Sequence, residues 1–428
     1  MDMGAGKLLV LLTNYYPFYK GEEYIENEIA IAAERFEKVL IIPTMATKDM
    51  LPTRKVPDNV EIVKLDLDYS LPGRVKMVLR GLKNTRGGNP SARGKKLGPE
   101  QRAYSLYYAA RAEYVFSEIT KNSAFIAVTS RYAPQNIAIY SYWLHITASV
   151  AVRLKERVFH HQCVCISRGH RYDLYDYAAP CKYIPDREFM LGHIDAVYPC
   201  SEDGVQYLKA HYGEFADKIK VGRLGTLERE KVTCEREPVF SIVSCSAVRE
   251  VKRLDKIIDT VAYLNSKGYA IRWTHLGDGP YLDEVRKYAE KNLPEKLYRF
   301  AGRLANKDLF GWYASNPVSC FMNLSDSEGV PVAIMEVMSC GIPTIATDVG
   351  GTKEIVLNGV NGYVVQTTDP VETIAAAVIE MMELPEQDYQ NMCGESIRLW
   401  NVLSNAVELY REFYDQLEAL LDEKAQAK

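Results

Sequence analysis

The sequence predicts an α/β protein in which two doubly wound parallel sheets form two domains that face a cleft. Short apolar runs alternate with helical patterns along the 428 residues, which is typical of parallel sheets with helices on both faces. A polar stretch at 226–238 divides the runs into two series. We therefore expect an N-terminal domain over 1–225, a C-terminal domain over 226–395, and a helical segment over 396–428 that crosses back to the first domain.

Seven apolar runs of the first series are predicted to be strands buried on both faces, because they are short and rich in Val, Ile and Leu. They are 7–13, 38–44, 60–65, 136–142, 163–167, 196–201 and 219–225. The first run holds only five consecutive apolar residues, Leu8 to Leu12, too few for the core of a signal peptide. The start of the chain is therefore read as a buried strand.

Six further runs follow in the second series, at 239–247, 270–277, 297–302, 319–325, 343–348 and 362–367. Helical patterns at 255–268 and 369–384 separate some of them, and 396–421 is amphipathic and strongly helical. In open parallel sheets, ligands bind beyond the carboxyl ends of the strands. The chemistry of this chain is therefore expected at its strand ends.

The composition is that of a soluble globular protein, with 47% hydrophobic and 25% charged residues. A formal net charge of −4 excludes general binding of polyanions by the whole molecule. No apolar run reaches the roughly 18 residues of a membrane-spanning helix. The nine cysteines form no Cys-x-x-Cys motif, so neither a disulfide framework nor a metal site is expected. We expect a cytoplasmic protein.

One segment, 74–102, departs from this balance because it carries nine Lys or Arg residues and one acid, Glu100. Its first part places Val75, Val78 and Leu79, together with Leu82, on one helical face. Such a helix can lie on an anionic membrane surface, which would make the protein peripheral on the inner face of the membrane. A solvated basic loop is the alternative. Nucleic acid is not an expected partner, because no binding motif accompanies the segment.

The stretch SDSEGVPVAIMEVMSCGIPTIATDVGGTKEIV (325–356) carries the strongest local signal. Glu328 follows a predicted strand, and Pro331 opens a helix. Backbone N–H groups near Gly329 and Val330 could bind a diphosphate, since helix N-termini bind anions, whereas proline has no N–H to donate. Glu336, two turns on, could accept hydroxyl protons from a ribose. A helix cap for Glu328 and a surface charge for Glu336 are the alternatives.

Three more strand ends carry residues that suit the same chemistry. Glycines or cations follow the strands in each case: Gly350 and Gly351; Gly277, Asp278 and Gly279; Lys252 and Arg253. Each glycine cluster alone would fit an ordinary turn. Four strand ends together predict one site that binds phosphate and reads hydroxyl groups.

These motifs resemble those of family 4 glycosyltransferases, which have the GT-B fold of two Rossmann-like domains. Glu328 and Glu336 match the family's E-x7-E signature, and 239–385 is similar to its donor-binding domain almost throughout. The first half resembles the capsular, colanic-acid-like polysaccharide branch at 15–29, 139–144 and 167–177.

The resemblance implies a retaining transfer of a sugar from a nucleotide diphosphate sugar, typically a UDP-linked hexose or N-acetylhexosamine. The acceptor would be a glycan or lipid-linked glycan of cell-surface polysaccharide biosynthesis. Glu336 would bind ribose, Glu328 the donor sugar, and Lys252 the diphosphate. Members usually carry an arginine five residues before that lysine, where this chain has Ala247. No metal or other cofactor is implied, because cationic side chains and helix ends stabilise the leaving phosphate.

The resemblance also assigns residues of the first domain. His170 matches the active-site histidine, which donates a hydrogen bond to the donor sugar. Arg168 and Asp173 would orient its loop or touch substrate, and Tyr16, Gly21 and Glu22 lie in the first-strand loop, near the acceptor. The expected donor-binding set is Lys252, Arg253, Gly277, Asp278, Gly279, Gly329, Val330, Val332, Glu336, Gly350 and Gly351.

Two other functions stay open at this point. One is a phosphorylase or an epimerase with the same fold, although no extra phosphate site or cofactor lysine is apparent. The other is a non-catalytic nucleotide-sugar binder, which Ala247 makes conceivable unless Arg249 or Arg253 supplies the second cation.

Overall fold

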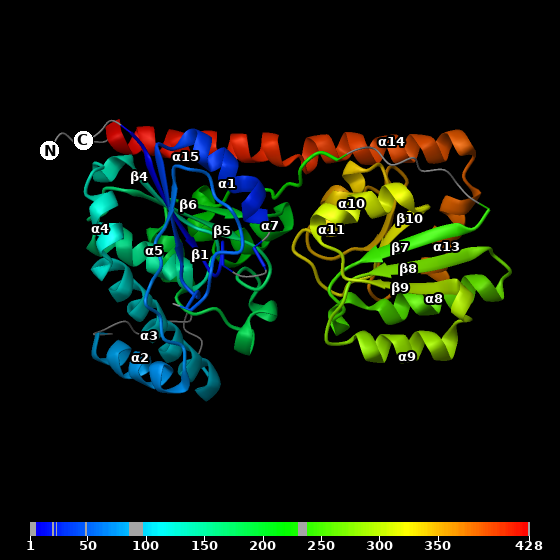
Figure 1. The fold of residues 1–428 in the computed structure, drawn as a ribbon, viewed down its shortest axis with the longest axis horizontal. Coiled ribbons are helices and arrows are strands. Elements are labelled where there is room, and N and C mark those ends of the chain that lie inside the picture. Colours follow the sequence, from blue (N-terminus) through cyan, green and yellow to red (C-terminus); the bar gives the residue numbers. More distant parts are fainter. Residues whose placement is uncertain are drawn as a thin grey trace. The chain divides into compact units, whose positions relative to one another are not determined.

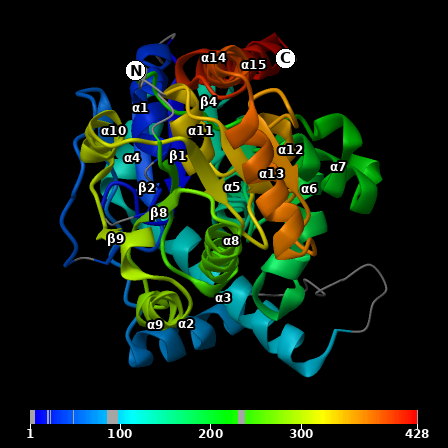
Figure 2. The same cartoon turned by 90° about the vertical axis from the view of Figure 1, so that its right-hand side faces the viewer.

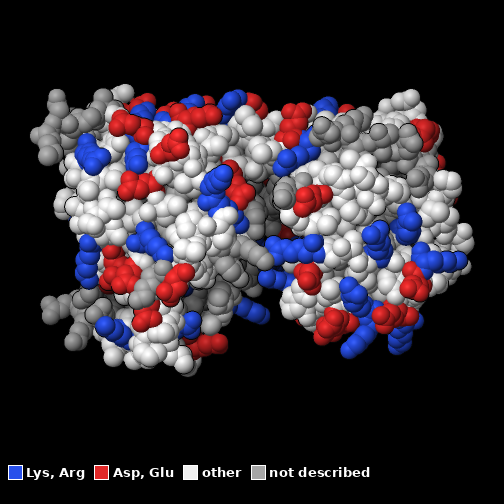
Figure 3. Space-filling view, in the orientation of Figure 1, with Lys and Arg blue, Asp and Glu red and all other residues white. Residues whose placement is uncertain are grey.

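The computed structural model describes residues 6–18, 21–22, 24–47, 49–84, 97–229 and 238–426, with backbone only at 80–84 and 306–307. The chain divides into two compact units, here unit 1 (Met1–Arg223 with Val407–Lys428) and unit 2 (Leu224–Ala406). Each contains a six-stranded parallel sheet covered by helices, as predicted (Figure 1). On the face drawn in Figure 3, acidic and basic side chains are interspersed.

The sheet of unit 1 has the order β3-β2-β1-β4-β5-β6. Its strands are β1 (Leu8–Thr13), β2 (Lys38–Pro43), β3 (Val60–Ile62), β4 (Ile137–Ser141), β5 (Val164–Gly169) and β6 (Ala196–Pro199). β1 is buried along its whole length, and Leu8 pairs with both Lys38 and Ile137. The strand order reverses between β1 and β4, so a ligand is expected outside their carboxyl ends.

Helices cover both faces of this sheet. They are α1 (Tyr24–Arg35), α2 (Leu71–Asn84), α3 (Pro99–Lys121), α4 (Ser123–Thr129), α5 (Ile146–Arg157), α6 (Arg187–His193), α7 (Glu202–His211) and α15 (Ala406–Gln426). Side-chain caps fix some of their starts: Asn122 accepts from the N–H groups of Ala124 and Phe125 at α4, and Ser201 accepts from Gly204 at α7. The helix predicted at the start of 74–102 is present as α2, but Pro99 to Arg102 are helical rather than a loop. Residues 85–96 of that segment lie outside the described residues.

Unit 2 repeats the arrangement, with the order β12-β11-β10-β7-β8-β9. Its strands are β7 (Phe240–Cys245), β8 (Ile271–Leu276), β9 (Tyr298–Gly302), β10 (Cys320–Asn323), β11 (Thr344–Thr347) and β12 (Gly362–Val365). Its helices are α8 (Leu254–Ser266), α9 (Leu282–Asn292), α10 (Asn306–Ser315), α11 (Val332–Ser339), α12 (Thr352–Ile355), α13 (Val371–Glu383) and α14 (Glu386–Leu403). Figures 1 and 2 show α8 and α9 on one face of the sheet and α10, α11 and α14 on the other. The order reverses between β7 and β10.

The prediction of one final helix over 396–428 is wrong, because the helix breaks at Ser404. The N–H of Thr226 donates to the Ser404 carbonyl, the N–H of Ala406 donates to the Thr226 carbonyl, and Trp400 Nε1 donates to Thr226 Oγ1. The backbone of Thr226 thus pairs with the Ser404 carbonyl and the Ala406 N–H, two groups that a continuous helix would pair internally. Residues 396–406 belong to unit 2, and only α15 returns to unit 1. Its Tyr414 hydroxyl donates to Glu28 of α1.

The strand predicted at 219–225 is not formed. Ile219 makes an isolated bridge to Val197, and the N–H groups of Lys220 and Gly222 donate to the carbonyls of Val197 and Pro199, but no regular ladder develops. The following carbonyls of Gly222 and Arg223 accept from Arg168 instead. Among the described residues, none of the helices is both long enough and apolar enough to cross a membrane.

Candidate active site

An ion pair joins the two strand ends at the reversal point of unit 2. A single 3₁₀ turn (Glu250–Lys252) follows β7, and the chain after β10 leads to Glu328. Lys252 Nζ lies 2.7 Å from Glu328 Oε1, and the two side chains are 23% and 13% exposed. The N–H of Asp326 donates to the Val251 carbonyl at 2.9 Å, which fastens the two loops together. The predicted diphosphate cation and sugar-binding carboxylate are therefore brought into contact.

The N-terminus of α11 lies directly after this carboxylate. Pro331 is the residue that caps the helix, and no side chain accepts a hydrogen bond from its first turn. The hydrogen bonds found among the described residues leave the N–H groups of Gly329 and Val330 unused. Unsatisfied N–H groups and the helix dipole favour an anion at this position.

Glu336 lies further along α11, on the side that faces the end of β7 and helix α10. Its charge acts on the Cys245 thiol and on the Tyr313 hydroxyl. Burial, reinforced by the Glu336 charge, raises the pKa of Cys245 to about 12, so the thiol is neutral and unreactive. Val332, one turn earlier, is half-buried. The pattern of the sequence predicted neither neighbour, because Cys245 reads as an ordinary strand residue.

The glycines at the strand ends are required by close backbone approach. A Cβ at Gly277 would lie 1.9 Å from the Ser246 carbonyl oxygen, and one at Gly279 would lie 2.3 Å from that of Val248. Asp278 takes part through its backbone: its carbonyl accepts from the N–H of Val248. These three residues therefore pack the β8 loop against the β7 loop.

The glycine pair after β11 packs against the loop of Glu328 in the same way. Gly350 has a φ of 52°, and a Cβ there would lie 2.2 Å from the Glu328 carbonyl oxygen. The N–H of Gly351 donates to the Gly329 carbonyl at 2.6 Å. That N–H is therefore not available to a phosphate, contrary to the expectation of a second anion-binding backbone at Gly351.

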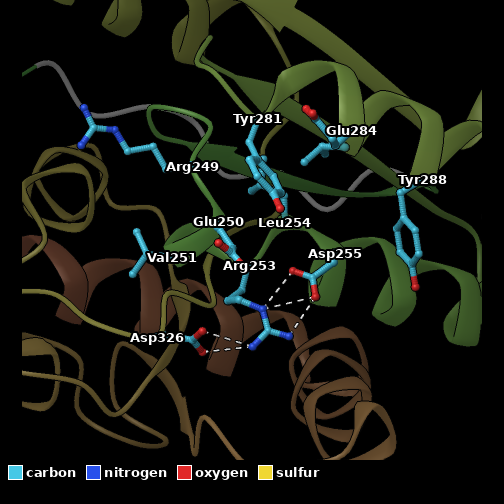
Figure 4. Close-up of a pocket in the computed structure, with 11 residues that line it drawn as sticks. Arg249, Glu250, Val251, Arg253, Leu254, Asp255, Tyr281, Glu284, Tyr288 and Asp326 are labelled. Atoms are coloured by element: carbon cyan, nitrogen blue, oxygen red, sulfur yellow. Dashed lines mark hydrogen bonds and ion pairs between the residues drawn. The ribbon is translucent and has the colours of Figure 1, made fainter.

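Arg253 points into a pocket of about 590 Å³ on the α8–α9 side of the sheet (Figure 4). Its guanidinium forms ion pairs with Asp255 at 2.8 Å and Asp326 at 3.2 Å. Arg249 is exposed and leaves the backbone in another direction. Two carboxylates thus balance the charge of Arg253, so Lys252 is the better placed of the two cations for a diphosphate. Ala247 is exposed and supplies no charge.

In unit 1, His170 follows the last residue of β5. It is 7% exposed, and its ring lies 4.4 Å from Trp143 and 5.0 Å from Tyr142 between centroids. Neither ring nitrogen has a hydrogen-bond partner among the described residues. Nδ1 lies 3.7 Å from the Asp173 carboxylate. Nε2 is therefore the nitrogen that suits a hydroxyl group of a ligand, because buried polar groups are nearly always paired.

Asp173 holds the loop of His170 in place. Its carboxylate accepts from the N–H of Leu144 at 2.7 Å and from the N–H of His170 at 2.9 Å. Burial opposes ionisation of Asp173, but the contacts with His170 and the two N–H groups outweigh burial and lower the pKa of the carboxyl. Of the two roles predicted for Asp173, the structure supports orientation of the loop.

Glu22 holds the loop after β1 in a similar way. Its two carboxylate oxygens accept from the N–H groups of Asn14, Tyr15 and Tyr16 at 2.6–2.8 Å and from Trp143 Nε1 at 2.6 Å. A carboxylate offers about four acceptor sites, so Glu22 has none left for an acceptor sugar. Glu22 was predicted to lie near the acceptor. In the structure its carboxylate anchors the loop after β1.

Two other first-loop predictions also change. Tyr16 is fully buried and its ring faces the guanidinium of Arg54, so it cannot stack on an acceptor. Gly21 has a φ of 101°, which favours glycine, and its carbonyl accepts from Arg54. Both residues shape the loop.

Arg168 is fully buried, and its contacts are with protein groups. Its guanidinium donates to the Tyr140 hydroxyl at 2.7 Å, pairs with Glu28 at 3.5 Å, and lies 4.4 Å from the ring centroid of Phe413 in α15. Arg168 therefore joins β5 to the last helix. Of the two roles predicted for Arg168, these contacts favour support of the loop that follows β5.

The aromatic residues around His170 were not predicted. Trp143 lies 5.0 Å from Tyr172 between ring centroids, and the Tyr172 hydroxyl accepts from Asn14 at 3.1 Å. Trp143 thus connects the anchored first loop, through Glu22, with the histidine. The position of Trp143 just after β4 was the available signal, since β4 ends at the reversal point. His170 belongs to unit 1 and Glu328 to unit 2.

A family model for glycosyl transferases group 1 matches residues 228–400. The chain is 25% identical over 231 residues to the Salmonella typhimurium protein assigned to colanic acid biosynthesis as glycosyltransferase WcaL, covering 52% of this chain and 56% of WcaL. It is 23% identical over 223 residues to the amylovoran biosynthesis glycosyltransferase AmsK of Erwinia amylovora, covering 49% and 52%. The chain thus spans about half the length of the curated relatives it matches.

Solved structures match nearly the whole chain. The lipopolysaccharide outer core galactosyltransferase WaaB superposes with a TM-score of 0.66 at 14% identity, covering 96% of this chain and 99% of WaaB. HepE of Anabaena, in complex with UDP and glucose, superposes with a TM-score of 0.63 at 15% identity, covering 96% and 99%. Residues 228–400 therefore match the group 1 glycosyl transferase domain, and the chain as a whole has the two-domain GT-B fold of these solved glycosyltransferases.

Proposed function

We propose that this protein transfers a hexose or N-acetylhexosamine, with retention, from a UDP-linked sugar to a glycan or lipid-linked glycan. The observation that carries the proposal is the Lys252–Glu328 ion pair beside the uncapped N-terminus of α11. A lysine and free N–H groups suit a diphosphate, and the adjacent carboxylate suits the hydroxyls of the attached sugar. Glu336, on the side of α11 that faces the end of β7, would accept the ribose hydroxyls.

UDP is preferred as the nucleotide on the strength of solved relatives with the same fold. HepE is in complex with UDP and glucose, and the pneumococcal O-GlcNAc transferase GtfA is in complex with UDP and GlcNAc. Relatives of the WcaL and AmsK kind act in exopolysaccharide biosynthesis by their names. We extend that context to this chain, with a cytoplasmic location and peripheral attachment to the membrane through 74–102.

The proposed reaction is a displacement on the front face of the sugar. The acceptor hydroxyl oxygen bonds to the anomeric carbon as the bond from that carbon to the diphosphate oxygen breaks, and the hydroxyl proton passes to the leaving phosphate. Lys252 and the N–H groups of Gly329 and Val330 neutralise the charge that develops on the diphosphate. Glu328 holds the sugar hydroxyls. Neither a metal ion nor another cofactor enters this scheme.

A thermal-shift screen against UDP-, GDP- and ADP-sugars tests the donor, because a ligand that binds the native state raises its melting temperature. We expect the largest rise with UDP-sugars, and a Glu336→Ala variant should lose that rise and the transfer activity. Glu354→Ala, a change on α12 that leaves α11 intact, is the control. A Glu336→Ala protein that transfers at the wild-type rate would contradict the proposed site.

The same assay separates the other two functions. Free sugar or an epimer released with UDP, in the absence of acceptor transfer, would indicate a phosphorylase or an epimerase. Tight UDP binding without turnover across a panel of donors and acceptors would indicate a non-catalytic binder.

A further inference from the structure

Helix α2 presents a ridge of exposed apolar side chains. Leu71, Val75 and Leu79 are 79%, 60% and 59% exposed. Their spacing of four residues places them on one face of the helix. They account for three of the eleven large apolar side chains that are exposed among the described residues. Single exposed apolar residues are ordinary on a protein surface, whereas a row of three on one helix marks an interaction site.

The opposite face of α2 is already packed. Met77 is 1% exposed, and a Cβ at Gly73 would lie 2.5 Å from the Asp68 carbonyl oxygen. Asp68 also accepts from the N–H of Ser70, just before the helix. Since Gly73 and Met77 are two positions away from Leu71 and Val75, they lie about 200° around the helix. The ridge is therefore an additional apolar face and not the side by which α2 joins unit 1.

Basic side chains flank the ridge. Arg74 and Lys76 are both exposed and lie on either side of Val75. Carboxylates also lie close to the helix: Asp49, Asp66, Asp68 and Glu118 line a pocket together with Gly73, Lys76 and Met77. This pocket is on the Gly73 side of the helix, away from the ridge. Figure 1 shows α2 at the edge of unit 1, and in Figure 3 the surface there is largely uncharged, with basic and acidic side chains around it.

We propose that α2 is a membrane-docking helix, which lies in the interface of an anionic bilayer with Leu71, Val75 and Leu79 at the acyl boundary and Arg74 and Lys76 at the phosphates. An apolar ridge flanked by cations matches such a surface. A second copy of the chain fits less well, because a two-fold contact would place each basic flank against its own counterpart. The proposal rests on the peripheral attachment proposed above and is independent of the transfer chemistry.

The test is flotation of the full chain with vesicles of phosphatidylcholine, with and without phosphatidylglycerol. Wild type should float with the anionic vesicles at low salt, and the triple variant Leu71→Ser, Val75→Ser, Leu79→Ser should lose about tenfold or more in partitioning. The matched control, Ile126→Ser, Val239→Ser, Val402→Ser, removes three apolar side chains that are 49%, 38% and 63% exposed elsewhere and should float like wild type. Arg74→Ser, Lys76→Ser should weaken flotation and its dependence on salt.

The outcomes separate the two levels of the proposal. If wild type does not float with anionic vesicles, the peripheral attachment itself is wrong. If wild type and the triple variant float equally well, attachment stands and α2 is not the docking element. A vesicle-free dimer in sedimentation that the triple variant abolishes would assign the ridge to a second copy and overturn the lipid assignment. Unchanged melting temperatures of the variants show that folding is not the cause.

Discussion

The two units use carboxylates at the ends of their strands in opposite ways. In unit 2, Glu328 is paired with the side chain of Lys252, a cation that an incoming anion can attract. In unit 1, Glu22 and Asp173 are occupied by backbone N–H groups and by Trp143, and they fix loops. The comparison teaches that the same residue type supplies exchangeable charge in one unit and a rigid frame in the other. His170, whose ring nitrogens make no hydrogen bond among the described residues and whose Nδ1 lies 3.7 Å from Asp173, is the group that this frame presents.

Lys252→Met should produce the largest effect, because it removes the cation that is proposed to neutralise the charge of the diphosphate. We expect kcat to fall about a hundredfold or more, the range seen when one stabiliser of developing charge is lost. The measurement is steady-state transfer at saturating donor. Lys267→Met, at the end of α8 on the same unit, is the control and should leave the rate unchanged. Equal rates for both variants would show that Lys252 takes no part in the reaction.

Glu22→Gln tests the frame of unit 1. The amide has one acceptor oxygen and adds two donors next to N–H groups, so we expect a loss of about 2–4 kcal/mol in the free energy of unfolding. Urea unfolding measures it, with Glu34→Gln, on the exposed side of α1, as the control. UDP binding by unit 2 should stay at the wild-type level. A variant that is as stable as wild type but unable to bind UDP would contradict both assignments: Glu22 as part of a stabilising frame in unit 1, and UDP binding in unit 2.

Acid should weaken both units, because each buries a neutral histidine. Burial lowers the pKa of His145 in unit 1 and of His275 in unit 2 to about 4. The unfolded imidazole titrates near 6.5, so the unfolded state binds more protons between these values. Stability is therefore full above about pH 6.5 and falls as the pH drops towards 4, by about 2 kcal/mol per histidine at pH 5.

Urea unfolding at pH 7 and pH 5 checks this loss. His275→Gln should remove the acid-induced loss of unit 2 and leave that of unit 1, and His145→Gln should do the reverse. His211→Gln, at the surface of α7, serves as the control. Identical losses in all four proteins would show that neither histidine is the cause.

Glu328→Gln should give the smallest effect and the opposite sign. Without the carboxylate, Lys252 is no longer held by a competitor, so we expect UDP to bind about fivefold more tightly, equivalent to about 1 kcal/mol. Titration calorimetry with UDP measures the change, and Glu250→Gln, on the adjacent turn, is the control. Weaker binding of UDP would mean that Glu328 itself positions the nucleotide. Transfer should still fall, because the sugar loses an acceptor of its hydroxyl protons.

Most of the fold could be predicted from the sequence because the strands, such as β1 and β7, are continuous apolar runs. Parallel sheets bury such runs on both faces. The donor loops were also predictable, since Lys252 and Glu328 directly follow two strands that must end at the same edge. Their contact at 2.7 Å confirms that proximity, while their roles in binding stay predictions.

Features that depend on distant packing could not be predicted. The burial of Arg168 depends on Phe413, which lies in the last helix of the chain. The break at Ser404 depends on Thr226, 174 residues from its partner Trp400. Glu22 looked like a loop residue near the acceptor, because nothing local shows that Trp143 and three N–H groups would fill its carboxylate.

The Lys252–Glu328 pair also bears on discrimination against free sugars. A neutral sugar that drew Glu328 away would leave Lys252 without compensation in a site that is mostly shielded from water, which costs free energy. A free phosphate that drew Lys252 away would leave Glu328 without compensation in the same manner. Only a molecule that carries anionic and hydroxyl groups together satisfies both side chains at once. The ion pair therefore favours the intact sugar nucleotide over either of its fragments, before any contact with the base is made.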